Sequence, residues 1–483
     1  MNIIKIIVLL MKILKTNILE GIKNNEIRGS QHLYKQVLAT LASSLLCLSA
    51  GLTNGISAVL LPKLMHDSSL SWESGFGSWI AAIAPISSIL GCVCVGTLLD
   101  GFGRRTVHII LAFPFMAGWL AMAFAEDFPT MMVGRFLTGL SYGAVRPTTI
   151  IYLGEISDPK YRGIILLCPS LALNLGVLLS HVIGSFIYWR TSLLICIAPS
   201  AIMFAMLFFI KESPYWLIAQ GRVEEGVECF RWFRGNGATA ESELQNVVEK
   251  QKGKTSKFSA KELFDTLRSS AFIRPTITVV FIFLTVQMCG INAFPFYAYD
   301  LLRTMFGDDE SYIATFFLIM AVDLIRVAAS IVICLFGKKM RRKLTFVVAA
   351  HGTTVILFGL VVCGVYKDLF ILSLTLLVLY TSLASVVASL GWTFIAELYP
   401  TKVRGIGSGL SGVICFGLLS VCVKLTPGLL WSGQPVMYGT FACVTGVSAV
   451  VLTFILPETN GRRLQDIEDS YNTKDKDIIV TPL

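Results

Sequence analysis

Charged residues are scarce in this chain: they make up 15% of its 483 residues, whereas hydrophobic residues make up 54%. A water-soluble protein of this length needs a much larger polar surface to cover its core. The sequence also lacks a Cys-x-x-Cys motif, a His/Cys cluster with metal-ligand spacing, a catalytic triad and a phosphate-binding loop. We therefore expect no enzyme activity, no catalytic residue, no bound metal and no other cofactor.

Long apolar runs dominate what is present. A run of about 20 residues is long enough to cross a bilayer as a helix. The sequence predicts an all-α membrane protein with twelve transmembrane helices, so the lipid bilayer is its main surrounding partner. The predicted spans cover residues 37–61, 76–99, 106–125, 128–153, 163–188, 191–210, 271–302, 312–336, 344–366, 369–396, 405–430 and 435–456.

The net charge of +9 comes from basic residues that stand between the apolar runs. Arg104, Arg105 and Arg162 fall on one side of the predicted membrane, whereas the acids Glu126 and Asp127 fall on the other. Because basic loops stay in the cytoplasm, this pattern predicts cytoplasmic N- and C-termini. The charge therefore indicates membrane topology and not nucleic-acid binding. The short outside loops hold no cysteine pair, so we expect no disulfide framework.

One charged cassette occurs twice in the chain. Glu155 stands seven residues before Arg162-Gly163, and Glu397 stands at the same spacing before Arg404-Gly405. Each cassette follows a long apolar run. A chain that repeats its order of helices and charged loops is built as two related halves, an architecture typical of carriers that rock one half against the other.

The predicted division of the chain follows from this repeat. We expect one six-helix bundle at 37–210 and a second at 271–456, which makes two pseudo-repeats. The charged segment at 211–270 has apolar residues at helical spacing, which predicts short amphipathic helices on the cytoplasmic face. We interpret 1–36 and 457–483 as cytoplasmic segments; a signal-like or interfacial helix is the alternative for the first.

Several motifs occur in a fixed order along the chain. They are Gly96-Thr97-Leu98-Leu99-Asp100-Gly101-Phe102-Gly103-Arg104-Arg105, Gly134-Arg135, the two cassettes, Glu212-Ser213-Pro214-Tyr215-Trp216-Leu217, Gln287-Met288-Cys289-Gly290-Ile291-Asn292 and Pro457-Glu458-Thr459-Asn460-Gly461. With these motifs, residues 37–467 resemble the sugar porters of the major facilitator superfamily, and most of all the insect facilitated trehalose transporter group. The resemblance implies a multi-pass plasma-membrane carrier of a small-molecule sugar that works by alternating access.

The resemblance also implies a sugar site in the middle of the membrane, between the halves. Its contacts are expected from Gln287, Asn292 and Tyr297 in the seventh span. Trp392 in the tenth span and Ser170 in the fifth, where many sugar porters have Gln, complete the set. Buried amides in a membrane are costly unless they are used, whereas a tryptophan is alternatively a packing residue. The positions that depart from the family pattern are Val286, Ser389, Gly391 and Cys415.

Charged residues at the predicted cytoplasmic ends form a candidate gate. The resemblance and the charge pattern predict that members from the two halves pair when the inside is closed and separate when it opens. The alternative is that the basic members only fix topology. The candidate gate residues are Arg104, Arg105, Glu155, Arg162, Glu212, Arg341, Arg342, Glu397, Arg404 and Glu458.

Two arginines, Arg146 and Arg326, fall inside predicted spans, where an unpaired charge is costly. Asp323 stands three residues before Arg326 and can pair with it on one helix face. Arg146 has no partner evident in the sequence. We favour pairing across helices for it; the alternative is that it faces the cavity and selects a polar or anionic substrate.

The first span carries no acid at its centre, which reads Gly51-Leu52-Thr53-Asn54-Gly55. A proton-coupled carrier needs a titratable group in the transport path. We therefore predict facilitated uniport of trehalose or a hexose. The alternatives are a proton-coupled sugar or organic-solute symporter and a non-transporting nutrient sensor, and the oligomeric state is left open.

Overall fold

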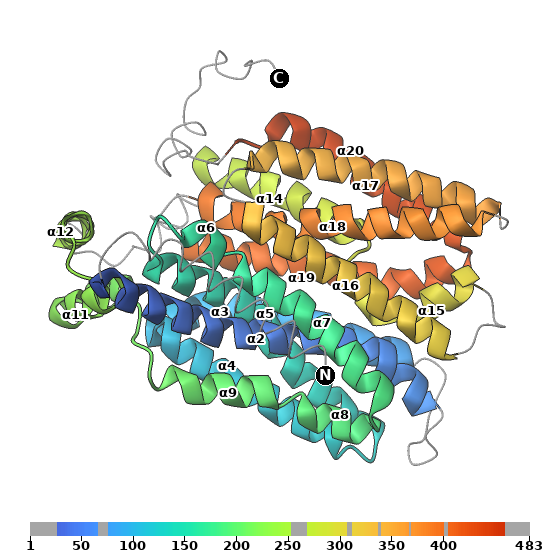
Figure 1. Ribbon diagram of the computed structural model, residues 1–483, viewed down its shortest axis with the longest axis horizontal. Coiled ribbons are helices and arrows are strands. Elements are labelled where there is room, and N and C mark those ends of the chain that lie inside the picture. Colours follow the sequence, from blue (N-terminus) through green and yellow to red (C-terminus); the bar gives the residue numbers. More distant parts are fainter. Residues whose placement is uncertain are drawn as a thin grey trace.

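The computed structural model describes residues 27–65, 76–252, 268–306, 312–336, 340–366, 369–399 and 404–458. Every regular element within these ranges is a helix. Figure 1 shows the helices in two adjoining groups, α2 to α9 in blue to green and α14 to α20 in yellow to red. We call these groups the N-terminal half and the C-terminal half.

The N-terminal half consists of long apolar helices with polar residues at their ends. Asp127, for example, caps one of them by accepting a hydrogen bond from the backbone N–H of Thr130 at 2.9 Å, and Pro129 follows in the first turn. The helices are α2 (Ile27–Met65), α3 (Phe76–Phe102), α4 (Arg104–Ala123), α5 (Phe128–Ile156), α6 (Arg162–Ile165), α7 (Cys168–Phe186), α8 (Trp189–Ile195) and α9 (Ala198–Leu207).

Three short helices, α10 (Pro214–Ala219), α11 (Val223–Arg234) and α12 (Ala238–Lys252), follow the N-terminal half. Tyr215 donates a hydrogen bond to Glu243 at 2.8 Å and so joins α10 to α12. Burial, and after it the charge of Glu243, raise the pKa of the Tyr215 hydroxyl, which therefore remains a donor. The apolar faces of the three helices pack on one another in a small core of their own.

The C-terminal half repeats the plan of long apolar helices. It packs through contacts of α17 with α18 and α20, and of α14 with α18, α19 and α20. Its helices are α14 (Ser270–Met288), α15 (Phe294–Phe306), α16 (Tyr312–Phe336), α17 (Arg342–Val365), α18 (Phe370–Leu398), α19 (Arg404–Trp431) and α20 (Gln434–Ile455).

The predicted span 271–302 is not one continuous helix. It breaks between α14 and α15 at Gly290, whose φ of +83° places it in the left-handed region. A Cβ atom at Gly290 would lie 2.8 Å from the ring of Phe441. The apolar run hides this break because Cys289 and Ile291, the residues on either side of Gly290, are hydrophobic. The predicted sixth span is likewise divided into α8 and α9, just before Pro199.

Within the described ranges, ten helical stretches are long and apolar enough to cross a membrane. Residues 272–288 of α14 form a shorter apolar helix. α5 is as long as the others but buries polar residues such as Arg135 and Arg146, which lower its hydropathy. The predicted all-helical membrane fold of twelve spans is confirmed.

Small residues hold the helices close together. Gly139 and Gly143 of α5 lie against the α3 backbone at Ala84 and Ser88, so any side chain there would collide. Close approach of backbones is the usual basis of helix packing in lipid. The two halves meet where α3 packs on α19, α7 on α16, and α2 on α15.

Candidate functional site

A polar pocket lies between the two halves. The N-terminal half contributes side chains from α5 and α7, and the C-terminal half contributes them from α14, α18, α19 and the break after α14. Such a position, enclosed by both halves, is where a carrier holds its substrate. The pocket is lined by Tyr142, Arg146, Ser170, Leu173, Asn174, Gln287, Asn292, Ala388, Ser389, Trp392, Cys415 and Phe416.

The helix break at Gly290 builds one wall of this pocket. It turns the chain so that Asn292 donates a hydrogen bond from Nδ2 to Oε1 of Gln287 at 2.9 Å. Gln287 in turn donates from Nε2 to Sγ of Cys415 at 3.0 Å, which ties α14 to α19. The two amides therefore present a fixed pair of polar groups to the pocket.

Trp392 and Ser170 face each other across the pocket through Arg146. The guanidinium of Arg146 lies over the Trp392 indole, with Cζ 5.1 Å from the ring centroid. Its Nη2 donates a hydrogen bond to Oγ of Ser170 at 2.7 Å. Trp392 also packs edge-on against Phe283, with ring centroids 5.0 Å apart. The indole is thus held rigidly and offers the pocket a flat apolar surface.

The structure gathers four of the five predicted substrate residues in one place. Gln287, Asn292, Trp392 and Ser170 line the same pocket, as the resemblance implied. Tyr297 lies elsewhere, in a second pocket of the C-terminal half with Tyr380 and Tyr438. Ser389 and Cys415, named above as departures from the family pattern, also line the pocket, and so does Arg146, which is the alternative that we did not favour. The other lining residues were missed by sequence reasoning. Asn174 had a detectable signal, because it stands one helical turn after Ser170 and so shares its face.

A chain of buried polar groups joins the two halves next to the pocket. We call it the α7–α16 bridge: His181 and Asn174 of α7 with Asp323, Arg326 and Ser330 of α16. Nδ1 of His181 contacts the Asp323 carboxylate, and both side chains are at most 1% exposed. Arg326 lies 3.9 Å from Asp323 and donates to Asn174 at 3.2 Å, and Asn174 donates to Ser330 at 2.7 Å.

The expected pairing of Asp323 with Arg326 on one helix face therefore exists. What the sequence did not predict is the third member, His181, which comes from the other half of the molecule. His181 stands seven residues beyond Asn174 along α7, or about 10 Å at the rise of a helix. The bridge thus runs from the pocket toward the end of the molecule that is distant from α6.

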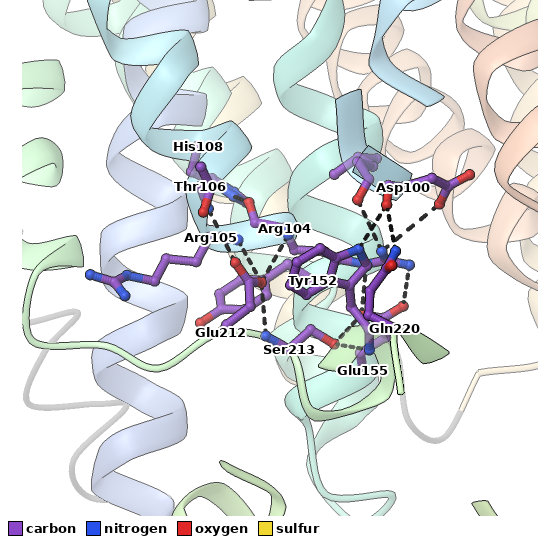
Figure 2. Close-up of polar contacts among 12 residues, drawn as sticks. Asp100, Arg104, Arg105, Thr106, His108, Tyr152, Glu155, Glu212, Ser213 and Gln220 are labelled. Carbon is purple, nitrogen blue, oxygen red and sulfur yellow. Dashed lines mark hydrogen bonds and ion pairs between the residues drawn. The ribbon is translucent and has the colours of Figure 1, made fainter. Parts of the chain in front are cut away.

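A second group of charges lies near α6 and α10, and Figure 2 shows it. We call it the Arg104 cluster: Arg104, Arg105, Glu155, Glu212 and Ser213. Arg104 donates from Nε and Nη2 to the two oxygens of Glu155, both at 3.0 Å. Glu212 accepts from the backbone N–H groups of Arg104 and Arg105 at 2.8 and 2.9 Å. The Glu212 carboxylate therefore caps the N-terminus of α4.

Every member of the Arg104 cluster except Ser213 is a predicted gate residue. All of its members belong to the N-terminal half or to the segment that leads from it into α10. Arg162 lies close by and donates to the backbone oxygen of Ser157 at 3.3 Å. Arg341 is exposed, whereas Arg342 and Glu458 are half-buried. The side chains of Glu397 and Arg404 lie outside the described part of the chain. The predicted pairing across halves therefore stays a prediction.

Comparison with known proteins agrees with this architecture. A family model described as "Sugar (and other) transporter" matches residues 35–471. The facilitated trehalose transporter Tret1 of Apis mellifera ligustica is 26% identical, over 90% of this chain and 88% of its own length. The Tret1 of Drosophila erecta is 28% identical, again over 90% of this chain but over 52% of its own length.

Solved structures share the fold. The proton:xylose symporter XylE bound to 6-bromo-6-deoxy-D-glucose superposes with a TM-score of 0.80 at 18% identity, and covers 91% of this chain and 100% of its own. The inward-open form of XylE from E. coli gives a TM-score of 0.69 at 19% identity, with 91% and 99% covered. From the family match over most of its length, the chain belongs to the family of sugar (and other) transporters.

Proposed function

We propose that this protein carries a small sugar across a membrane by alternating access. The observation that carries the proposal is the pocket between the halves, with its paired amides and its indole surface. Sugars present hydroxyl groups at their edges, which suit Gln287 and Asn292, and C–H groups on their faces, which suit Trp392. The naming of the relatives as facilitated trehalose transporters supports trehalose or a hexose as the substrate.

Alternating access requires contacts between the halves that form in one state and break in another. In this structure α7 packs on α16 through the bridge, and α3 packs on α19. Opening the pocket toward the His181 end must separate His181 from Asp323. The Arg104 cluster lies inside one half, so that half can move as a rigid body with the cluster intact.

Uniport is the mode that we propose. Arg135, buried in the N-terminal half, donates to the backbone oxygens of Thr53 at 2.9 Å and Ile80 at 3.0 Å and to the hydroxyl of Ser57 at 2.5 Å. All three acceptors are neutral, so this arginine does not share its environment with an ionising acid. Without such an acid in the first span, downhill transport needs no proton.

Proton-coupled symport is the second candidate, and one observation favours it. His181 and Asp323 are titratable groups, they are fully buried, and they lie between the halves where coupling requires them.

We also propose a location at the cell surface with both termini in the cytoplasm. The positive-inside pattern of the loops supports this topology.

The test is uptake of radiolabelled trehalose, glucose and xylose by liposomes that contain the purified full-length protein. Uniport predicts saturable uptake that stops at equal concentrations on the two sides and does not respond to an imposed pH gradient. Gradient-driven accumulation would replace uniport by symport.

Replacing Gln287 and Asn292 together by alanine should abolish uptake. Thr375→Val, at an exposed position on α18, is the matched control that should leave it unchanged.

A further inference from the structure

Arg146 is a buried cation that the protein itself leaves incompletely bonded. Its side chain lines the central pocket, and the residue is 6% exposed. A guanidinium has five N–H donors, yet among the described residues only one hydrogen bond, to Ser170, is made. Its buried Nε finds no acceptor in that part of the structure. A charge in this position is costly unless something pairs with it.

Arg135 on the same helix shows what a purely structural arginine looks like here. It stands three helical turns before Arg146 and is fully buried, and its three guanidinium nitrogens each donate to an acceptor. Arg135 lies away from the pocket, whereas Arg146 lines it. The neighbouring helices α2 and α3 therefore satisfy one buried arginine of α5 completely, whereas the described residues around the pocket do not do so for Arg146.

The buried carboxylate of the neighbouring bridge, that of Asp323, already has basic partners. Asp323 contacts His181 and lies 3.9 Å from Arg326, so it stands between two basic groups. Among the described residues that line the pocket there is no Asp or Glu. The pocket with its bridge therefore carries two arginines against one carboxylate, which leaves one positive charge without a counter-ion.

We propose that, among sugars of this size, the carrier prefers an anion, a sugar acid whose carboxylate binds Arg146. The inference rests on the transport function proposed above and names the class of substrate for the same pocket. Arginine suits this ligand because its planar fork matches the two oxygens of a carboxylate. The carboxylate supplies the missing counter-charge, and the hydroxyl groups of the sugar bind the amides of Asn174, Gln287 and Asn292.

Trp392 prepares Arg146 for this role. Stacking of the guanidinium over the indole occupies its face and leaves its N–H edge for hydrogen bonds. Ser170 takes one of these N–H groups and so fixes the rotation of the guanidinium plane. The remaining N–H groups are available to an anion that enters the pocket.

Competition in liposomes tests the inference. Purified full-length protein is reconstituted, and uptake of labelled D-glucuronate is compared with uptake of labelled D-glucose, a neutral sugar of the same size. We expect glucuronate to be favoured by at least about tenfold, because a hydrogen bond between charged groups contributes that much to binding. Uniport of glucuronate also moves one negative charge, so an inside-positive potential should raise its uptake and leave glucose uptake unchanged.

Two variants connect the result to Arg146. Arg146→Gln removes the charge and should abolish the preference for glucuronate, whereas Arg146→Lys keeps the charge without the fork and should retain part of it. If Arg146→Gln does not fold, the shift in melting temperature that glucuronate causes in the unmodified protein, compared with that from glucose, gives the answer. At equal concentrations glucuronate must then raise the melting temperature more than glucose does, and an equal shift from the two sugars would overturn the preference.

The possible outcomes distinguish the anionic substrate from the proposed sugar transport on which it rests. Uptake of glucose that glucuronate neither matches nor inhibits would overturn the anionic substrate and leave sugar transport standing. Full preference for glucuronate in Arg146→Gln would overturn the role of Arg146 in the same way. Folded protein that takes up neither of these two sugars nor trehalose would overturn the proposed transport function, and the anionic substrate with it.

Discussion

The Arg104 cluster and the α7–α16 bridge use the same chemistry in different places. In both, an arginine and a carboxylate come together with a further polar side chain. The Arg104 cluster joins helices of one half and is partly open to solvent, with 14% of the Arg104 side chain and 20% of the Glu155 side chain exposed. The bridge joins the two halves and is almost completely buried.

This difference in placement separates two roles. Contacts inside one half survive any rigid-body movement of the halves, so the Arg104 cluster holds the shape of the half that moves. Contacts between the halves must break when the halves separate, so the bridge contributes to the balance between states. Removing one member of the bridge should cost more stability than removing one member of the Arg104 cluster. The remaining partner in the bridge is buried, so water cannot solvate its unpaired charge.

Removal of the Asp323 charge is expected to have the largest effect. Asp323→Asn leaves His181 and Arg326 without their carboxylate, and the lost pairing should lower the free energy of unfolding by about 3 kcal/mol. The melting temperature should fall and hydrogen exchange along α7 and α16 should rise. A melting temperature equal to that of the unmodified protein would show that the bridge contributes nothing.

The double variant Asp323→Asn with Arg326→Gln sharpens this result. It removes the Arg326 charge together with the carboxylate, so Arg326 no longer stays buried as an ion without its partner, and part of the stability lost in Asp323→Asn should return. Thermal unfolding of the two variants side by side measures the difference. Strictly additive losses would mean that the two side chains do not interact.

Glu155→Gln should have a smaller effect on stability. It breaks the bidentate pair with Arg104 at a partly exposed site, which should cost about 1 to 2 kcal/mol. Because the cluster lies inside one half, the concentration of sugar that half-saturates uptake should not change. A large change in that concentration would assign the cluster a part in the movement between states.

The smallest effect is expected at the pair of Lys211 and Glu228, where the Glu228 side chain is 73% exposed. Glu228→Gln should alter the free energy of unfolding by less than about 0.5 kcal/mol, since water and salt screen such pairs. Thermal unfolding at two salt concentrations checks this. A loss of unfolding free energy as large as that of Glu155→Gln would show that burial does not determine how much these ion pairs contribute to stability.

The sequence predicts the fold well because its strongest signals are local. Apolar runs mark the helices, and the repeated cassette marks the two halves. Residues that share a helix face, such as Asp323 and Arg326, also follow from spacing alone. Contacts between helices depend on how each helix is rotated, which no run of residues specifies. The partner of Asp323 stands 142 positions away in the chain, and the sequence therefore did not reveal His181.

The pocket shows the same limit. The family resemblance named Gln287, Asn292, Trp392 and Ser170, and these residues do lie together. It did not anticipate the contacts of Arg146 with Ser170 and Trp392, because those three residues come from three different helices. The break at Gly290 escaped notice for another reason: the left-handed φ of one glycine marks it, and the long apolar run around it does not reveal that angle.

A reversible cross-link across the bridge tests most directly whether the halves separate there during transport. Cysteines are placed at His181 and Asp323 in protein whose exposed Cys94 and Cys443 are replaced by serine, and a control protein carries them at Glu155 and Ser213 in the Arg104 cluster. Sugar uptake is measured before oxidation, after oxidation and after reduction. The account predicts that oxidation stops uptake in the first protein, that reduction restores it, and that the control is unaffected. Unchanged uptake with the bridge fully cross-linked would contradict it.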